Sequence, residues 1–383
     1  MSNTWWKDES ELKKEQSDLL DLDLSTSILI KGPPGSGKTN LLLLKANHLH
    51  LGDKPNLYVI VYGKVLKQFI QVGGAQYKFP SSKISTHSRL FLHLLYEYDG
   101  SFDSTGLSIL EVRKAIATRL EELIASGKIG KIYDALLIDE AQDYFPAEIR
   151  IFRALADVLI AAADTRQKVY AVDDCSEALE FSVSDVYELK HHYRNGMEIC
   201  RLADGIMKGN PDHVPLVTHT SYDEKSNKSK VQPFANLSVV QQAAAMVDQI
   251  VNQRTAYPYE IIGIMCPRKE ELAILYVELS KTVLADELTR CSEDDFDPSK
   301  HIWFSTIASA KGLEFRTAHL AGLDFLSNTG SAQKRLAFTA VTRAKTTLSL
   351  YYEIKIPGYL ESALRSIAPE KTAITKANIF GKE

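Results

Sequence analysis

The segment from Gly32 to Thr39 constrains the fold of this chain more than any other part of the sequence. It reads GPPGSGKT and fits the pattern G-x-x-x-x-G-K-[S/T], in which the glycines let consecutive backbone N–H groups turn toward a phosphate. The apolar, strand-length run Ser27–Lys31 precedes it, and the apolar run Leu41–Leu44 follows it with helical character. A strand, a glycine-rich loop and a helix in this order favour an α/β domain with a phosphate-binding loop over a glycine-rich surface turn.

The residues of this loop have separate expected roles. The Lys38 ammonium is expected to reach the β- and γ-phosphates of a bound nucleotide, and the Thr39 hydroxyl is expected to bind Mg²⁺. A helix that begins directly after the loop adds favourable partial positive charge at its N-terminus. The predicted nucleotide ligands in this loop are Gly32, Pro33, Pro34, Gly35, Ser36, Gly37, Lys38 and Thr39.

Short apolar runs alternate with amphipathic helical stretches along the rest of the chain. The longest helical stretch is Ile109–Ser126, whereas Thr220–Gln232 is polar and has the character of a surface loop. This alternation predicts an α/β protein with parallel sheets, and the length of 383 residues favours two or three domains. The predicted strands are Ser27–Lys31, Leu57–Tyr62, Ala135–Ile138, Lys168–Val172, Ile261–Cys266, Ile302–Ser305, Thr317–Ala321 and Thr347–Tyr352.

Composition excludes several classes of protein. The chain is 45% hydrophobic and 25% charged, which is typical of a globular protein and not of a disordered chain or a coiled coil. The net charge of −4 argues against a uniformly basic nucleic-acid coat but leaves room for a local basic groove. The four cysteines have no C-x-x-C spacing, so we expect neither a zinc ribbon nor a disulfide framework. The first fourteen residues show no secretory signal, and no apolar run is long enough to span a bilayer, so the expected location is the cytoplasm with no membrane partner.

Two carboxylates, Asp139 and Glu140, stand at the end of the apolar run Ala135–Ile138. The carboxyl ends of strands in a parallel sheet are where ligands bind. Asp139 is therefore expected to hold Mg²⁺ and Glu140 to activate the attacking water, which are the two functions that a phosphate loop alone does not supply. The alternative is a solvated acidic turn, and the phosphate loop in the same chain argues against it.

The order of several further motifs is typical of one protein family. The segment Asp139–Asp143 reads DEAQD, and with it the chain resembles the UvrD/Rep-like superfamily 1 helicases. The resemblance extends from about Lys14 to Tyr352 and is most specific in the sequences KGLEF and TRAK. The other segments that match motifs of this family are Leu57–Leu66, Ser85–Ser88, Lys190–Asn195, Ser305–Phe315 and Arg335–Lys345.

The resemblance implies an α/β fold of two RecA-like P-loop NTPase domains with mainly parallel sheets. It places the first domain at residues 1–187, the second at 188–360 and a C-terminal tail at 361–383. ATP and Mg²⁺ are implied as cofactors, bound between the domains, with Arg194 and Arg343 of the second domain reaching the γ-phosphate. The implied catalytic residues are Lys38, Glu140, Arg194 and Arg343; the implied metal ligands are Thr39 and Asp139; and the further implied nucleotide contacts are Gln16, Gln142, Tyr193 and Glu314.

Two departures from the family pattern stand out. The family's third motif, Gly-Asp-x-x-Gln followed by aromatics, is assigned to Asp173–Phe181, where Glu177 and Glu180 occupy the places of the glutamine and of a stacking aromatic. Carboxylates there predict weak base stacking, which contributes about 1–3 kcal/mol per base. Too few residues separate Thr39 from Asp139 to hold more than a short helical replacement for the family's first accessory domain. The second accessory domain has no room at all, so a minimal two-domain form is expected.

Two functions of different classes follow from this pattern. The first is an enzyme, a DNA helicase or translocase that hydrolyses ATP, is stimulated by single-stranded DNA and works within a complex. The second is a regulatory module, an ATP-driven switch that controls a partner such as a nuclease in DNA repair or anti-phage defence and unwinds little by itself. The resemblance implies DNA as the nucleic acid, and the sequence shows no nuclease motif of its own.

Overall fold

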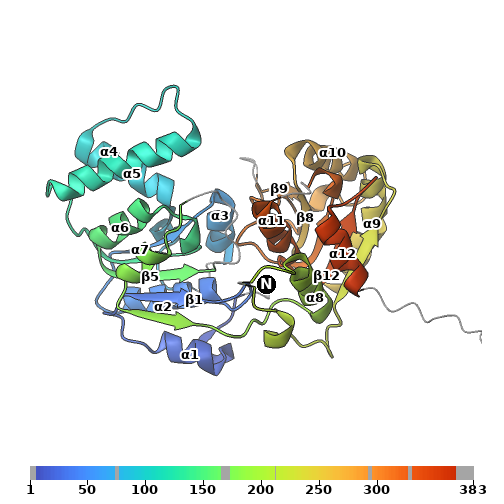
Figure 1. The fold of residues 1–383 in the computed structure, drawn as a ribbon, viewed down its shortest axis with the longest axis horizontal. Helices are drawn as coiled ribbons and strands as arrows, with labels where there is room; N and C mark the ends of the chain where they lie inside the picture. Colours follow the sequence, from blue (N-terminus) through green and yellow to red (C-terminus); the bar gives the residue numbers. More distant parts are fainter. Residues whose placement is uncertain are drawn as a thin grey trace, which may run out of the picture.

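Two domains, each built on a six-stranded sheet, lie side by side in the computed structural model (Figure 1). All strand pairs in both sheets are parallel, which confirms the predicted α/β class with parallel sheets. The structure describes residues 6–73, 77–164, 173–211, 213–291, 296–326 and 330–367.

The first sheet has the strand order β3-β2-β4-β5-β1-β6. Its strands are β1 (Ile28–Lys31), β2 (Leu57–Val61), β3 (Ile84–Thr86), β4 (Tyr133–Ile138), β5 (Ala156–Ala163) and β6 (Asp185–Glu188). The helices of this domain are α1 (Lys14–Leu20), α2 (Lys38–Leu51), α3 (Lys64–Gly73), α4 (His87–Asp99), α5 (Ile109–Ala125), α6 (Pro146–Leu155) and α7 (Ser176–Phe181).

The second sheet has the strand order β7-β12-β11-β8-β10-β9. Its strands are β7 (Lys230–Phe234), β8 (Ile262–Cys266), β9 (Leu288–Arg290), β10 (Ile302–Thr306), β11 (Phe315–Leu320) and β12 (Ala344–Tyr351). The helices of this domain are α8 (Met197–Ile206), α9 (Val239–Ala256), α10 (Lys269–Leu279), α11 (Ser331–Val341) and α12 (Gly358–Ile367).

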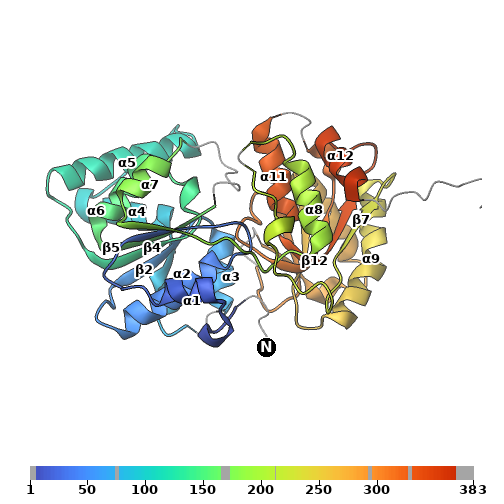
Figure 2. The ribbon, with the colours of Figure 1, turned by 60° about the horizontal axis from the view of Figure 1, so that its bottom comes forward.

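Helices cover both faces of each sheet, which explains why the strands read as continuous apolar runs. Along β4, Leu136 and Ile138 pack into the core under α4, α5 and α6, whereas Ala135 and Leu137 pack into the core under α2. In the second domain α9 and α10 cover one face, and α8, α11 and α12 cover the other. Figure 2 shows α8 between α11 and α12. The core under α2 and α3 continues into the second domain, where the ring of Phe69 meets the ring of Trp303 edge-on at 5.4 Å.

Several elements differ from the sequence-based expectation. The strand expected at Lys168–Val172 lies outside the described residues, and the structure contains an unpredicted strand, β5, in the middle of the first sheet. The expected loop Thr220–Gln232 is too long, because β7 begins at Lys230 and pairs with β12. The domain boundaries expected at 187/188 and 360/361 fall within β6 and within α12, and the division itself stays a prediction.

Helices α4 and α5 form a hairpin that projects from the first domain on the side away from α9 (Figure 1). It occupies the stretch between the phosphate loop and the acidic motif where a short helical replacement was expected. Arg119 of α5 joins the two helices through an ion pair to Asp99 at 2.6 Å. Leu107, Ile109 and Leu110 at the start of α5 are exposed. Among the described residues no helix is long and apolar enough to cross a membrane.

Candidate nucleotide-binding site

The phosphate loop connects β1 to α2, as the sequence predicts, and its glycines are required by the backbone. Gly35 and Gly37 have φ angles of +76° and +87°, and residues with a side chain rarely adopt such values. A Cβ at Gly35 would lie 2.5 Å from Cβ of Arg194, and a Cβ at Gly37 would lie 2.5 Å from Nε2 of Gln16. The Tyr193 N–H also donates to the Gly35 carbonyl at 3.0 Å. The loop is therefore in direct contact with the segment that leads into the second domain.

Lys38, the first residue of α2, turns back over the loop. Its Nζ donates to the carbonyl oxygens of Gly32 at 2.8 Å and Pro33 at 2.9 Å. Burial lowers the pKa of Lys38, while the nearby carboxylates of Asp164, Glu140 and Asp139 oppose that shift. The Lys38 ammonium thus lies where it would contact a phosphate bound in the loop.

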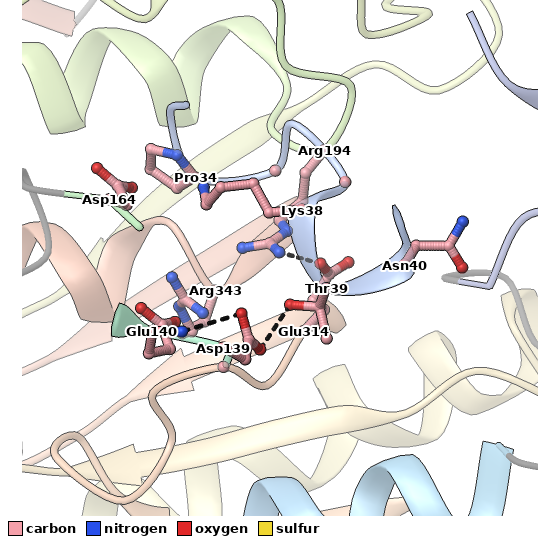
Figure 3. A pocket seen from close by; sticks show the side chains of 13 residues that line it. Pro34, Lys38, Thr39, Asn40, Asp139, Glu140, Asp164, Arg194, Glu314 and Arg343 are labelled. Atoms are coloured by element: carbon pink, nitrogen blue, oxygen red, sulfur yellow. Dashed lines mark hydrogen bonds and ion pairs between the residues drawn. The ribbon is translucent and has the colours of Figure 1, made fainter. Parts of the chain in front are cut away.

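Asp139 lies at the carboxyl end of β4 and faces the loop. Its Oδ2 accepts a hydrogen bond from the Thr39 hydroxyl at 2.8 Å (Figure 3). Burial, with the charge of Glu140 beside it, raises the pKa of Asp139 to about 7. A cation at this point would compensate the negative charge of Asp139. The Asp139 carboxylate and the Thr39 hydroxyl therefore fit a Mg²⁺ ion that takes its other ligands from phosphate and water. Within the described ranges no group of three or more His, Cys, Asp or Glu side chains is arranged to hold a metal by itself.

Glu140 follows in a backbone conformation that is rare for a residue with a side chain, at φ +51°. Gln142 holds it by donating from Nε2 to a Glu140 carboxylate oxygen at 2.5 Å, while the Gln142 Oε1 accepts from the Asp164 N–H at 2.8 Å. Burial acts to raise the pKa of Glu140, but Lys311, Arg343 and Lys38 together bring it below its usual value. Glu140 is therefore ionised at neutral pH, as a proton acceptor must be.

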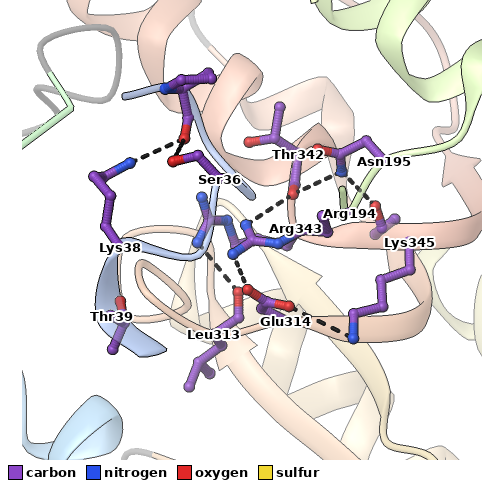
Figure 4. Close-up of polar contacts among 12 residues, drawn as sticks. Ser36, Lys38, Thr39, Arg194, Asn195, Leu313, Glu314, Thr342, Arg343 and Lys345 are labelled. Carbon is purple, nitrogen blue, oxygen red and sulfur yellow. Dashed lines mark hydrogen bonds and ion pairs between the residues drawn. The ribbon is translucent and has the colours of Figure 1, made fainter. Parts of the chain in front are cut away.

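The second domain supplies two arginines to the same pocket (Figure 3). Arg343 is buried, and it donates from Nε to the Thr339 carbonyl at 3.0 Å and from Nη1 to the Leu313 carbonyl at 3.1 Å. Burial and the proximity of Arg194 lower the pKa of Arg343 to about 10, so it keeps its charge at neutral pH. Arg194 forms an ion pair with Glu314 (Figure 4).

A second hollow adjoins the first, and it is lined by Gln16 and Tyr193 among others. Gln16 donates from Nε2 to the Ser36 carbonyl at 2.8 Å, which ties α1 to the phosphate loop. The Tyr193 hydroxyl donates to Glu15 at 2.9 Å, and the Lys7 ammonium lies 5.3 Å from the centre of the Tyr193 ring.

The structure brings most of the predicted site residues together. Two of them, Gln16 and Tyr193, line the adjoining hollow. Gly32, Pro33, Ser36 and Gln142 line neither hollow and instead hold the phosphate loop and Glu140 in place. The predicted residues that line the first pocket are Pro34, Gly35, Gly37, Lys38, Thr39, Asp139, Glu140, Arg194, Glu314 and Arg343.

The assignment of the third motif to Asp173–Phe181 is wrong. Strand β5, which lies beside β4 in the sheet, also ends at the pocket, and the residue after it, Asp164, lines the pocket. Ala163-Asp164 with Gln167 has the spacing of the family's Gly-Asp-x-x-Gln motif and could have been found at the end of the apolar run ADVLIAAA. Glu180 instead forms an ion pair with Lys31 at 2.6 Å, and Phe181 is 83% exposed.

A second functional candidate that the sequence analysis missed is Lys311, the lysine of KGLEF. Its Nζ lies 2.5 Å from Oδ2 of Asp143 and 3.5 Å from Oε2 of Glu140. The sequence carried a signal for this residue, because Lys311 stands in a segment that matches a family motif. Lysine is almost never fully buried without a partner. The partner of Lys311, however, lies in the other domain.

Comparison with known proteins assigns the end of the second domain. Residues 301–351, which include β10, β11, α11 and β12, match the model of the UvrD-like helicase C-terminal domain. This segment is therefore similar to a UvrD-like helicase C-terminal domain. The predicted resemblance to superfamily 1 helicases is confirmed by this match, and the Arg343 and Glu314 side chains described above belong to the matched segment.

A solved structure of PRRSV helicase is 16% identical to the chain, with a TM-score of 0.43, over 88% of this chain and 54% of that chain. The chain thus spans about half the length of that structure. No curated protein matches the sequence.

Proposed function

We propose that the chain is an ATPase motor of the superfamily 1 helicase type, which hydrolyses ATP between its two domains and moves on single-stranded DNA. One observation carries the proposal. The phosphate loop, the carboxylates Asp139 and Glu140, and the arginines Arg194 and Arg343 line a single pocket between the two domains, although the sequence separates them widely.

The residues of the pocket fit ATP with Mg²⁺. Thr39 and Asp139 would hold the metal ion, which supplies positive charge at the phosphate oxygens when bound. Lys38 leaves the loop carbonyls to pair with the phosphates, and the Glu140 carboxylate accepts a proton from the attacking water. Arg194 and Arg343 then stabilise the negative charge that develops on the γ-phosphate, which is a role that raises hydrolysis rates by orders of magnitude.

The proposed reaction also couples the two domains. The phosphate loop and the carboxylates belong to the first domain, whereas both arginines belong to the second. A γ-phosphate that contacts the groups of both domains holds the domains together. Hydrolysis of the γ-phosphate removes that attraction. This cycle of closing and opening supplies the movement of a motor on a nucleic acid.

The interdomain groove beside Tyr62, Lys64 and Ser309 is the proposed route for nucleic acid. Tyr62 does not present a free ring there, because it stacks on His87 at 5.4 Å and its hydroxyl accepts from Arg113 at 2.9 Å. These contacts favour a core-packing role for Tyr62 over stacking on a nucleic-acid base. Binding by charge is therefore expected to dominate, and it should weaken as salt rises.

The proposal is tested by ATP hydrolysis with and without single-stranded DNA, with single-stranded RNA of equal length as a second arm. We expect hydrolysis that rises when single-stranded DNA is added, in wild type and not in Glu140→Gln. Hydrolysis that is equal in wild type and in Glu140→Gln would refute the assignment of the active site.

A regulatory switch is the second candidate function, and the α4–α5 hairpin is the observation that favours it. Ile109 at its tip is 90% exposed, and Leu107 and Leu110 beside it are also exposed. Exposed apolar side chains grouped at one tip are typical of a protein contact. Hydrolysis that no nucleic acid stimulates, with no unwinding by the isolated chain, would favour the switch over the motor. A protein partner, a nuclease among the candidates, and the cytoplasmic location stay predictions.

A further inference from the structure

The loop between β10 and β11 reaches across to the first domain and packs on α3. Gly312 has a φ of +84°, and a Cβ on it would lie 2.7 Å from a side-chain carbon of Leu66. Phe69, one turn further along α3, meets Trp303 of β10 edge-on. These contacts leave no room for a side chain at Gly312 and fix the position of the residue before it, Lys311, against the first domain.

Lys311 points from this loop into the DEAQD turn. Its Nζ lies 2.5 Å from Oδ2 of Asp143 and 3.5 Å from Oε2 of Glu140, the carboxylate proposed to activate water. The side chain of Lys311 is 5% exposed, that of Asp143 is fully buried, and that of Glu140 is 13% exposed. One ammonium therefore holds two carboxylates that lie three residues apart on a single 3-10 turn, Ala141–Asp143 with Glu140 at its start.

The energetics of such a cluster depend on all of its members. Charges that are buried together are costly to desolvate, and removal of one partner leaves the others without compensation. Gln142 also holds Glu140, but it belongs to the same turn and stays with Glu140 whatever the second domain does. Lys311 is different, because it arrives from the second domain and contacts Glu140 only when the two domains are docked as they are here.

We propose that Lys311 is a positioning residue that aligns Glu140 for water activation when the second domain is docked on the first. The proposal rests on the ATPase function proposed above and adds a regulatory step to it. When the domains separate, Lys311 leaves with the second domain, and Glu140 and Asp143 face each other without it. Hydrolysis is thereby restricted to the closed arrangement, in which Arg194 and Arg343 also reach the pocket.

The test compares Lys311→Met, Lys311→Arg and wild type for steady-state ATP hydrolysis and for binding of a fluorescent ATP analogue. We expect Lys311→Met to lower kcat by about 30-fold, which is part of the 10²- to 10⁴-fold that acid–base catalysis contributes, and to leave analogue affinity within about twofold. Lys311→Arg keeps the positive charge and is expected to recover kcat to within about fivefold of wild type. The matched control is Lys269→Met, an exposed lysine of α10, which should leave both quantities unchanged.

The outcomes separate this proposal from the function on which it rests. If Glu140→Gln hydrolyses ATP as wild type does, the proposed ATPase site fails. If Glu140→Gln is inactive but Lys311→Met keeps wild-type kcat, only the positioning role fails. A loss of analogue affinity equal to the loss of kcat, or no recovery in Lys311→Arg, would also overturn it, because either would indicate a structural role.

A second variant keeps the proposal open to refutation if Lys311→Met does not fold. Asp143→Asn retains the shape of the turn but weakens the hold on Lys311. It is expected to lower kcat by about fivefold, with analogue affinity unchanged, because Lys311 loses the partner that aims it at Glu140. Unchanged kcat in Asp143→Asn, with a melting temperature equal to that of wild type, would overturn the proposal.

Discussion

The two domains share one architecture but supply opposite chemistry to the pocket between them. Each is a six-stranded parallel sheet covered by helices on both faces. The first domain supplies the phosphate loop and the carboxylates Asp139, Glu140 and Asp164 from the ends of β4 and β5. The second domain supplies mainly cations, which are Arg194, Lys311, Arg343 and Lys345.

This division shows why neither domain forms a complete site. The first domain can cradle phosphates and a metal ion, but it has few cations with which to stabilise charge developing on a γ-phosphate. In the second domain Glu314 pairs with Arg194 and lies 3.6 Å from Lys345, so this carboxylate holds two of the cations in place. The chemistry therefore depends on how the domains meet. Three predictions test this difference, from the largest expected effect to the smallest, and a fourth, with the smallest effect, tests a property that the domains share.

The largest effect is expected when the phosphate-binding cation of the first domain is removed. Lys38→Ala should lower kcat/KM for ATP by about 10⁴-fold, because both phosphate positioning and charge stabilisation depend on this ammonium. The measurement is steady-state hydrolysis together with binding of a fluorescent ATP analogue. Lys45→Ala offers no fair comparison because Lys45 is buried, so Lys128→Ala, at an exposed lysine that lines neither the pocket nor the groove, is the control. Near-normal kcat/KM in Lys38→Ala would contradict the assignment of the phosphate site to the first domain.

The next effect separates chemistry from binding within the first domain. Glu140→Gln should lower kcat by about 10³-fold and leave nucleotide affinity nearly unchanged, because the amide cannot accept the proton of the attacking water. Single-turnover hydrolysis and equilibrium binding of the same analogue give the two quantities. Wild-type turnover in this variant would remove Glu140 from the role of general base.

Loss of either arginine tests the contribution of the second domain. Arg194→Ala and Arg343→Ala should each lower kcat by about 10²-fold, with little loss of nucleotide affinity. Arg343 also donates hydrogen bonds to the Leu313 and Thr339 carbonyls. The melting temperature of the Arg343→Ala variant must therefore be compared with that of wild type before its kcat is interpreted. A structure with bound nucleotide in which both guanidinium groups lie beyond hydrogen-bond reach of the γ-phosphate would contradict the division of roles between the domains.

The smallest effect concerns a property in which the two domains are alike. Burial lowers the pKa of His87 in the first domain and of His319 in the second, each to about 3, so both are neutral in the folded protein. Below the unfolded value near 6.5 the unfolded chain binds protons that the folded chain does not, so the free energy of unfolding falls as pH drops. Between pH 6.5 and pH 5.0 each histidine should lower the free energy of unfolding by about 2 kcal/mol.

Urea unfolding at pH 6.5 and 5.0 measures this loss. His87→Gln and His319→Gln should each show a smaller loss between the two pH values than wild type shows. His87 lies 3.8 Å from Glu148, which would favour its charged form, but burial and the charge of Arg113 outweigh that contact. An equal loss in wild type and in both variants would show that neither histidine is held neutral.

Local patterns in the sequence were sufficient wherever a functional group and its neighbours lie close together along the chain. The phosphate loop is the clearest case, because Gly35 and Gly37 must adopt positive φ angles and the strand and helix on either side are encoded next to them. The acidic pair at the end of β4 was found for the same reason. The hairpin of α4 and α5 was expected as a short replacement for a larger domain, but the exposure of Ile109 was not.

Prediction failed where a strand lacks its usual composition. The run ADVLIAAA forms β5, and its last three residues are alanines, which have low strand propensity. These small side chains are buried between the helices on either face of the sheet, so packing outweighs propensity. The third motif was consequently placed too late in the chain, and the weak base stacking predicted from Glu177 and Glu180 loses its basis.

The sequence by itself determined the fold class, the phosphate loop and most of the charged groups of the site, because each depends on short-range geometry that a few consecutive residues encode. Only the tertiary structure decided which of those groups meet. Lys311 and Asp143 are 168 residues apart, and Arg194 and Glu314 are 120 apart, yet each pair is in contact. Such contacts follow from the docking of two separately built sheets, whose free energy is spread over a common apolar core and is not contained in any local pattern.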